Sequence, residues 1–358
     1  MNQYVLLKTD LNRWVEMARK KYRVYAPERV QEDIFFAPLL GPPESEFLTG
    51  LAVLPYLPPK DLVFPQSEIL FSYSREGEKI ALTVPDQETE ASVLLGIRSC
   101  DTVGISWMDK FFRENFNDTY YGRRRDNLIT VTIACNRPIK NCFCVCCEGG
   151  PFLDPGKNSF DLQLIDMNDR YLVECNSDQG ETLINLDPAL FSAPPPDMEA
   201  MRNRLEEEAR SMFLPEPTSY MGTAIRRITA DSVPSEVWTE LGERCFDDGG
   251  CTFVCPCCSC FGVGYLAHGS GGCHYRFWDS CDYSGFTREV SGHNPRGEKG
   301  ERFKRRFFHK LSYQYVKKDG RIGCVGCGRC ITACPGEVGM PTVVETIRRS
   351  DTGDSSKE

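Results

Sequence analysis

The pattern of apolar and polar residues predicts an α/β unit in the first half of the chain. Residues 9–20 carry apolar side chains at helical spacing, which predicts an amphipathic helix. The runs 92–97 and 128–134 are continuously apolar, as is typical of strands that are buried on both faces. Residues 102–113 lie between them and are expected to form a helix with Asp101 as its N-cap. This order of strand, helix and strand favours a parallel sheet.

Shorter segments complete this half of the chain. Residues 23–26 are expected to form a strand that Pro27 ends, because proline has no N–H group to donate. Residues 35–65 are rich in proline and aromatic residues, so we expect an irregular covering layer there. Residues 160–164 and 171–175 have the alternation of a β-hairpin.

The second half is predicted to be mainly helical. Three consecutive prolines at 194–196 predict a stiff linker. Residues 197–212 are expected to form a charged helix with Asp197 as its cap, and residues 235–244 a further helix. The glycine-rich segment 262–272 follows no clear strand and is expected to be a flexible loop.

Composition and charge narrow the class of protein. The chain has 358 residues, 41% of them hydrophobic, and a mean hydropathy of −0.37, which predicts two or three globular domains. It shows no apolar stretch of membrane-spanning length and no secretory signal, so a cytoplasmic location is expected. In that reducing compartment 19 cysteines predict metal binding rather than disulfides. A net charge of −9 argues against nucleic-acid binding.

One run of cysteines has the spacing of an iron–sulfur loop. The segment CVGCGRCITACP matches the C-x2-C-x2-C-x3-C-P pattern of bacterial ferredoxins, which bind [4Fe–4S] clusters. Three thiolates wrap one cluster, and the fourth reaches a second cluster. Zinc sites use pairs of cysteines and do not require this spacing. The cysteines of this loop are Cys324, Cys327, Cys330 and Cys334.

A matching loop lies upstream, with aspartate at the second ligand position. Its ligand positions are Cys245, Asp248, Cys251 and Cys255, followed by proline. The crossed rule assigns Cys255 to the cluster of Cys324, Cys327 and Cys330, and Cys334 to the cluster of Cys245 and Cys251. Asp248 either binds the fourth iron or is a loop residue beside a three-iron cluster. Oxygen suits iron less well than thiolate, so that iron should be labile in both cases.

The other cysteines form two further groups with candidate metal sites. Buried cysteine is a common small apolar residue, which is the simplest interpretation of Cys175 and Cys273. Cysteines concentrated in short loops are harder to explain by packing, and thiolate clusters select iron–sulfur centres or zinc. The first group is Cys100, Cys135, Cys142, Cys144, Cys146 and Cys147. The second is Cys258, Cys260 and Cys281, and the two groups could also meet in one site.

The fold class follows from these patterns: an α/β N-terminal domain and an α+β dicluster ferredoxin-like C-terminal domain. We expect an α/β domain with a cysteine-rich loop over residues 1–192, and a linker and helix over 193–234. The dicluster domain with an insert spans 235–348, and a disordered tail spans 349–358.

A basic stretch in the insert has two interpretations. Residues 296–321 carry many lysines and arginines in an otherwise acidic chain. They form either a solvated helix face or a docking surface that steers an acidic partner towards the clusters. The residues proposed for docking are Arg302, Lys304, Arg305 and Arg306.

Several segments together resemble a known family. GIRSCDTVGISWMDKFF is similar to that family's GVRPCD segment, and NCFC, CPCCSCF, WDSC, SGHNPR, RFFHKLSY and CVGCGRCI follow in the family's order. They resemble the iron–sulfur subunits of soluble sulfhydrogenases, where the beta subunit is the member, and of anaerobic sulfite reductase. Related subunits serve flavin oxidoreductases linked to heterodisulfide reductases. Members usually have cysteine at the Asp248 position, and Cys257, Cys146 and Cys147 are additions here.

The resemblance implies a non-catalytic electron-transfer subunit with two [4Fe–4S] clusters, one of them Asp-ligated or of the three-iron type, and room for a third. Two partners are expected: an FAD/NAD(P)H-binding subunit, and a catalytic hydrogenase, sulfite reductase or heterodisulfide reductase-type subunit. Two alternatives remain open. An extra cluster could bind a sulfur substrate directly and make the chain catalytic, or zinc could stabilise a scaffold. No G-x-G-x-x-G loop follows a predicted strand, which argues against a Rossmann-type dinucleotide site.

Overall fold

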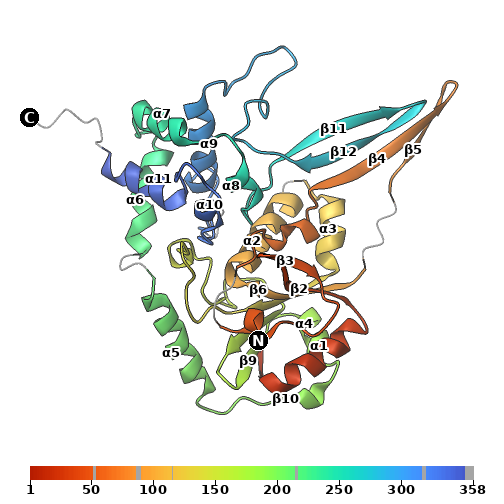
Figure 1. Ribbon diagram of the computed structural model, residues 1–358, viewed down its shortest axis with the longest axis vertical. Helices are drawn as coiled ribbons and strands as arrows, with labels where there is room; N and C mark the ends of the chain where they lie inside the picture. Colours follow the sequence, from red (N-terminus) through yellow and green to blue (C-terminus); the bar gives the residue numbers. More distant parts are fainter. Residues whose placement is uncertain (51–53, 86–89, 115, 214–216, 317–319, 351–358) are drawn as a thin grey trace, which may run out of the picture.

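The computed structural model describes residues 1–50, 54–85, 90–114, 116–213, 217–316 and 320–350 (Figure 1). An eight-stranded mixed sheet forms the first half, in the order β10-β1-β9-β8-β7-β6-β2-β3. Its four strands β2, β6, β7 and β8 are parallel to their neighbours within this set, and the other pairings are antiparallel. The strands are β1 (Asn2–Leu7), β2 (Arg23–Val30), β3 (Asp33–Pro38), β6 (Ser92–Arg98), β7 (Leu128–Ile133), β8 (Leu162–Asp166), β9 (Arg170–Cys175) and β10 (Phe191–Ser192).

Helices cover this sheet and confirm the predicted α/β unit. The helix expected at 9–20 is present, and Trp14 and Val15 pack into the core below it. The two buried strands and the hairpin around residue 168 are confirmed as well. The helices of this half are α1 (Leu11–Arg19), α2 (Ser99–Asp109), α3 (Thr119–Asp126) and α4 (Asp178–Ile184), and a π-helical turn (Lys110–Glu114) extends α2.

Two local predictions in this half were wrong. Strand β2 runs through Pro27 to Val30, because it pairs with β6 only up to Tyr25 and the missing N–H costs no ladder bond beyond that point. Helix α2 begins at Ser99, so Asp101 lies in its first turn and is not the cap. The segment predicted to be irregular, 35–65, contains part of β3 and two short 3₁₀ turns, η2 (Ser45–Leu48) and η3 (Pro59–Leu62), with residues 51–53 outside the described part.

A second, four-stranded sheet crosses the predicted domain boundary. It has the order β11-β12-β4-β5 and extends away from the body of the molecule (Figure 1). Residues 262–272 belong to this sheet, so the prediction of a flexible loop was wrong. Gly264 lacks a side chain where the ring of Tyr275 lies, which lets an aromatic side chain cover the strand. The strands are β4 (Ser67–Glu76), β5 (Lys79–Thr83), β11 (Phe261–His268) and β12 (Gly271–Trp278).

The second half packs its helices around an aromatic core. Trp238 of α7 contacts Phe303 and Phe307 of α9 there. Asp197 has helical dihedral angles and makes no side-chain cap, unlike its predicted role. The predicted tail lies outside the described residues from 351 onward. The helices are α5 (Met198–Ser211), α6 (Pro217–Thr229), α7 (Ser235–Arg244), α8 (Gly250–Phe253), α9 (Lys299–Leu311), α10 (Arg329–Thr332) and α11 (Met340–Arg349).

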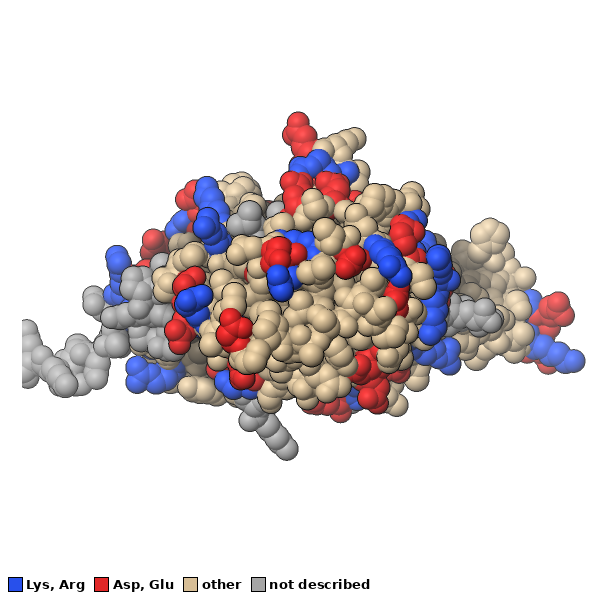
Figure 2. Space-filling model, turned by 90° about the horizontal axis from the view of Figure 1, so that it is seen from below, with Lys and Arg blue, Asp and Glu red and all other residues tan. Residues whose placement is uncertain are grey.

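The face of the molecule below α1 and β10 carries mixed charge. Acidic and basic side chains are interspersed over it, with a broad uncharged area between them (Figure 2). The chain's net charge of −9 is therefore not gathered into one acidic patch on this face.

Candidate metal centre

The two predicted loops adopt the same backbone conformation. Each places a left-handed residue two positions after its first cysteine, at Asp247 and Gly326, with φ of 54° and 64°. Each has a left-handed glycine two positions later, at Gly249 and Gly328, and a four-residue helix follows directly. The loops are thus related by internal pseudo-symmetry, and Asp248 occupies the position that corresponds to Cys327.

One cavity brings together cysteines from both loops. Cys255 comes from the end of the first loop, and it lies within electrostatic range of Cys324, Cys327 and Cys330 of the second. All four line the same enclosed space, which Phe143 and Met340 close on the apolar side. This is the set that the crossed rule predicts for one cluster.

The second loop fits an anionic cluster through its backbone. The N–H group of Gly326 donates to the Cys324 sulfur at 3.4 Å. A side chain at Gly326 or Gly328 would collide with carbonyl oxygens of residues 143 and 141, both at 2.5 Å from the built Cβ. Glycine is therefore required here by left-handed dihedrals and by close backbone approach.

The other crossed set lies nearer the surface. Val338 donates to the Cys334 sulfur at 3.4 Å, and Asp247 donates to Cys245 at the same distance. Asp248 is exposed, and its Oδ1 accepts from the N–H of Gly250 at 2.8 Å. This bond has the same two-residue reach as the bonds at Cys245 and Cys324, so the carboxylate occupies the place of a ligand sulfur.

Three buried cations surround the cysteines, and the sequence predicted a role for only one of them. Lys310 donates from Nζ to the Cys255 sulfur at 3.2 Å and is 7% exposed. Hydrogen bonds from the thiols of Cys257 and Cys258 lower the pKa of Cys255, and the charge of Lys310 lowers it further. Burial lowers the pKa of Lys60, although the nearby Cys258 and Cys255 favour its charged form. Arg306 is the third cation, 3% exposed.

The first extra group of cysteines divides in two. The thiol of Cys144 bonds Cys142, and the nearby Cys100 and Cys135 raise the pKa of Cys144 further. These four lie past the carboxyl ends of β6 and β7, in the position where α/β sheets bind ligands. Arg98 donates to Cys135 from the end of β6. The four thiols therefore form one group at the end of the sheet.

Cys146 and Cys147 do not join that group. The Cys147 thiol donates to Cys324, which lowers the pKa of Cys324, and Cys146 is also close to Cys324. They support a ligand of the enclosed cavity and do not complete the group of four.

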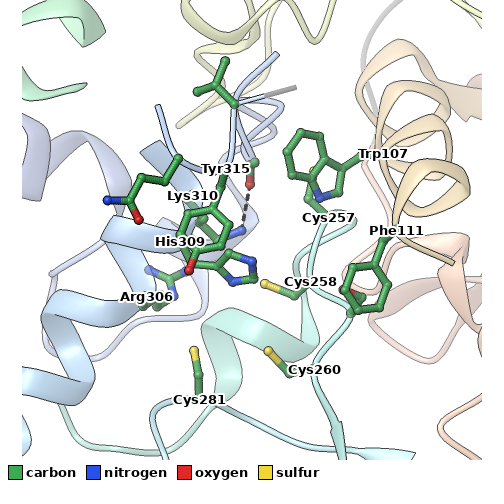
Figure 3. A pocket seen from close by; sticks show the side chains of 14 residues that line it. Trp107, Phe111, Cys257, Cys258, Cys260, Cys281, Arg306, His309, Lys310 and Tyr315 are labelled. Carbon is green, nitrogen blue, oxygen red and sulfur yellow. Dashed lines mark hydrogen bonds between the residues drawn. The ribbon is translucent and has the colours of Figure 1, made fainter. Parts of the chain in front are cut away.

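The second extra group lines a larger cavity. Cys258, Cys260 and Cys281 share a space of about 310 Å³ with Arg306 and Lys310 (Figure 3). The Cys260 thiol and the Cys281 thiol are hydrogen-bonded to each other. This cavity lies beside the enclosed one, because Cys258 also bonds Cys255.

A buried ion pair joins the α/β domain to the second loop. Arg329 of α10 donates to both carboxylate oxygens of Asp101 at 2.6 and 3.0 Å, and both side chains are almost completely buried. The N–H of Phe143 donates to the carbonyl of Gly326 at 2.8 Å beside it. The cysteine-rich loop and the ferredoxin-like loop are therefore held together.

The docking prediction is partly wrong. Arg302 and Arg306 are buried, because Arg302 pairs with Asp247 and Arg306 donates to the carbonyl of Cys251. Neither can contribute to a docking surface. Lys304 and Arg305 remain partly exposed on the other side of α9, and their docking role stays a prediction.

A mononuclear metal site is not preformed. Among the described residues, no three His, Cys, Asp or Glu side chains converge as ligands of a single metal ion. Thiolates that bind a four-iron cluster surround a cubane and do not converge on one ion, so this finding bears on the zinc-scaffold hypothesis alone.

Comparison with known proteins decides the family. Residues 244–338 match the family model described as a 4Fe-4S dicluster domain. Sulfhydrogenase 2 subunit beta from Pyrococcus furiosus is 32% identical over 294 residues, which cover 82% of this chain and 83% of that protein.

The chain belongs to the iron–sulfur subunit family of sulfhydrogenase beta. It is accordingly an iron–sulfur electron-transfer protein of oxidoreductase type, with an α/β layout and a C-terminal 4Fe-4S dicluster domain. Like the family, this sulfhydrogenase-beta-type chain gathers its cysteines around the dicluster domain. No helix in the described part of the chain has both the length and the apolar character that a membrane crossing requires.

Proposed function

We propose that this chain relays electrons between a terminal hydrogenase or sulfur-compound reductase and an FAD/NAD(P)H-binding subunit. The observation that carries the proposal is the exchange of cysteines between two matched loops around one buried cavity. A beta subunit of a sulfhydrogenase is its relative, which supports assembly into a complex. When bound, iron–sulfur clusters take up and release single electrons.

The ligands proposed for the dicluster domain are the two crossed sets. One cluster takes Cys255 with Cys324, Cys327 and Cys330, which share a cavity. The other takes Cys245, Cys251 and Cys334, with Asp248 at its fourth iron. Asp248 is proposed as a ligand because it stands at the Cys327-equivalent position with a matching backbone hydrogen bond.

The four thiols at the end of the sheet are proposed as ligands of a third cluster. Cys100, Cys135, Cys142 and Cys144 interact with one another, and the buried Arg98 offers a compensating charge. Cys100 also lies in electrostatic range of Cys327. Four thiolates make such a cluster anionic, so a buried cation beside them lowers the cost of burial.

The positions of these cysteines put the enclosed cavity between the other groups. Cys330 is near Cys251 of the other crossed set, and Cys327 is near Cys100. An electron that enters at one end would therefore have a short route to the other. Lys310 donates to the Cys255 ligand, and such a bond to a ligand sulfur favours the reduced state.

The test is reduction of the purified chain with and without its neighbour. We expect NADPH or NADH to bleach the visible absorption of the iron-loaded chain only after the flavin-binding subunit that co-purifies from the native host is added. A chain that is reduced by the nucleotide alone would contradict the relay, since it would have its own nucleotide site. A chain that consumes a sulfur substrate with a dye donor, in the absence of other subunits, would establish the catalytic alternative instead.

A further inference from the structure

Three cysteines outside the dicluster loops line one cavity from two directions. Cys258 and Cys260 follow the first loop, and Cys281 follows β12. Their sulfur atoms face a shared space in Figure 3, with the Cys260 and Cys281 thiols hydrogen-bonded across it. Three thiols arranged in this way are a ligand set that packing alone does not require.

The charges around this space call for an anion. Arg306 and Lys310 form part of the lining and are nearly completely buried. The Nε of Arg306 is buried without a hydrogen-bond partner among the described residues. Lys60 also lies nearby and donates to the carbonyl of Cys258 at 3.1 Å. Buried cations are costly unless they are compensated, and a thiolate-bound cluster supplies the negative charge.

The set has three cysteines and a fourth corner without one. Cys257 is the remaining cysteine in the lining, but its thiol bonds Cys255 of the neighbouring cavity. A cubane has four iron atoms to be coordinated, so one of them would face the open space of about 310 Å³.

We propose that Cys258, Cys260 and Cys281 hold a further four-iron cluster, and that its fourth iron binds a small anion with a sulfur donor atom. A sulfur donor suits iron that is already surrounded by soft thiolates. An anion suits the cationic lining. The site does not depend on the dicluster assignment, because none of its three cysteines belongs to either crossed set.

A second cavity offers such an anion a route to the site. It encloses about 230 Å³ and shares Cys260, Cys281 and His309 with the first. Arg296 and Arg305 line it, so its charge has the same sign as the inner lining. Clefts lined by one sign of charge concentrate ions of the opposite sign.

The cluster is tested by iron and acid-labile sulfide analysis of two variants. Cys260→Ala and Cys281→Ser remove ligands on different segments, and each should lose about four iron and four sulfide per chain. Cys273→Ser is the matched control in β12, opposite Ser72 of β4, and should retain all its iron. If both ligand variants keep the wild-type iron content, there is no cluster at this site.

The open corner is tested by electron paramagnetic resonance of the reduced wild-type protein. Sodium hydrosulfide should shift the one signal that Cys260→Ala lacks, and sodium sulfate should leave it unchanged. The same shift in His309→Ala would show that the histidine is not the fourth ligand. A signal that hydrosulfide does not move would mean that a protein group closes the corner, and an equal response to sulfate would reduce the site to general anion binding; either result overturns the proposed ligand.

Discussion

Asp248 is the residue at which this chain departs most clearly from its own internal symmetry. Its partner position in the second loop is Cys327, and the two loops share their left-handed residues. An exposed carboxylate that accepts one backbone N–H still has a second oxygen to offer iron. Oxygen holds iron less firmly than thiolate in a cluster of this kind.

We therefore expect mild oxidation to release one iron from the wild-type protein and to produce a three-iron signal in electron paramagnetic resonance. Asp248→Cys should suppress this conversion and shift the reduction potential of that cluster, because ligand type and charge set the potential. Asp248→Ala should favour the three-iron form from the start. Equal iron content and equal potential in all three proteins would show that Asp248 is a loop residue and not a ligand.

The limits of sequence-based prediction are visible at the same scale. Ligand cysteines could be predicted because ferredoxin spacing is local and short. Lys60 and Lys310 could not be given a role, because a lysine has no local pattern that places it against a sulfur atom far away in the sequence. The division of the six-cysteine group was equally hidden, since Cys144 and Cys147 are neighbours that face different partners.

Among the secondary-structure elements, α2 and α10 are joined by the buried pair of Asp101 and Arg329. The sequence predicted Asp101 as a helix cap, which is a local role. Its actual partner is 228 residues away. Hairpin β11–β12 was missed for a related reason, because its glycines are explained only by the aromatic rings of the opposite strand.

Removal of one partner of this pair should destabilise the interface of the two elements. Asp101→Asn leaves Arg329 buried without its counter-charge, and the free energy of unfolding should fall by about 3–5 kcal/mol. Anaerobic denaturant titration measures this change. Asp126→Asn is the matched control, because its pair with Arg113 is solvent-exposed and worth at most about 1 kcal/mol. Equal effects of the two substitutions would refute a structural role for the buried pair.

For the whole molecule, the cysteine groups form a continuous arrangement with the enclosed cavity at its centre. The other crossed set, the group at the sheet end and the larger cavity each approach it, through Cys251, Cys100 and Cys258 respectively. A relay needs a donor at one end and an acceptor at another, so partner docking belongs to this scale.

The exposed basic residues of α9 are the proposed docking site. The double substitution Lys304→Glu and Arg305→Glu should slow electron transfer from an acidic partner and flatten its dependence on salt. Stopped-flow measurements over a range of ionic strength give both quantities. Arg204→Glu on α5 changes charge elsewhere and should have little effect. If the α9 variant keeps the wild-type rate and salt response, Lys304 and Arg305 form only a solvated face.

The most direct test of the account is a comparison of three cysteine variants by iron content and electron paramagnetic resonance. Crossed ligation requires Cys255 to hold the same cluster as Cys327, although the two lie in different loops. We predict that Cys255→Ala and Cys327→Ala lose the same signal and about four iron each, and that Cys251→Ala loses a different signal. If Cys255→Ala instead matches Cys251→Ala, each loop binds its own cluster and the proposed arrangement of the relay is wrong.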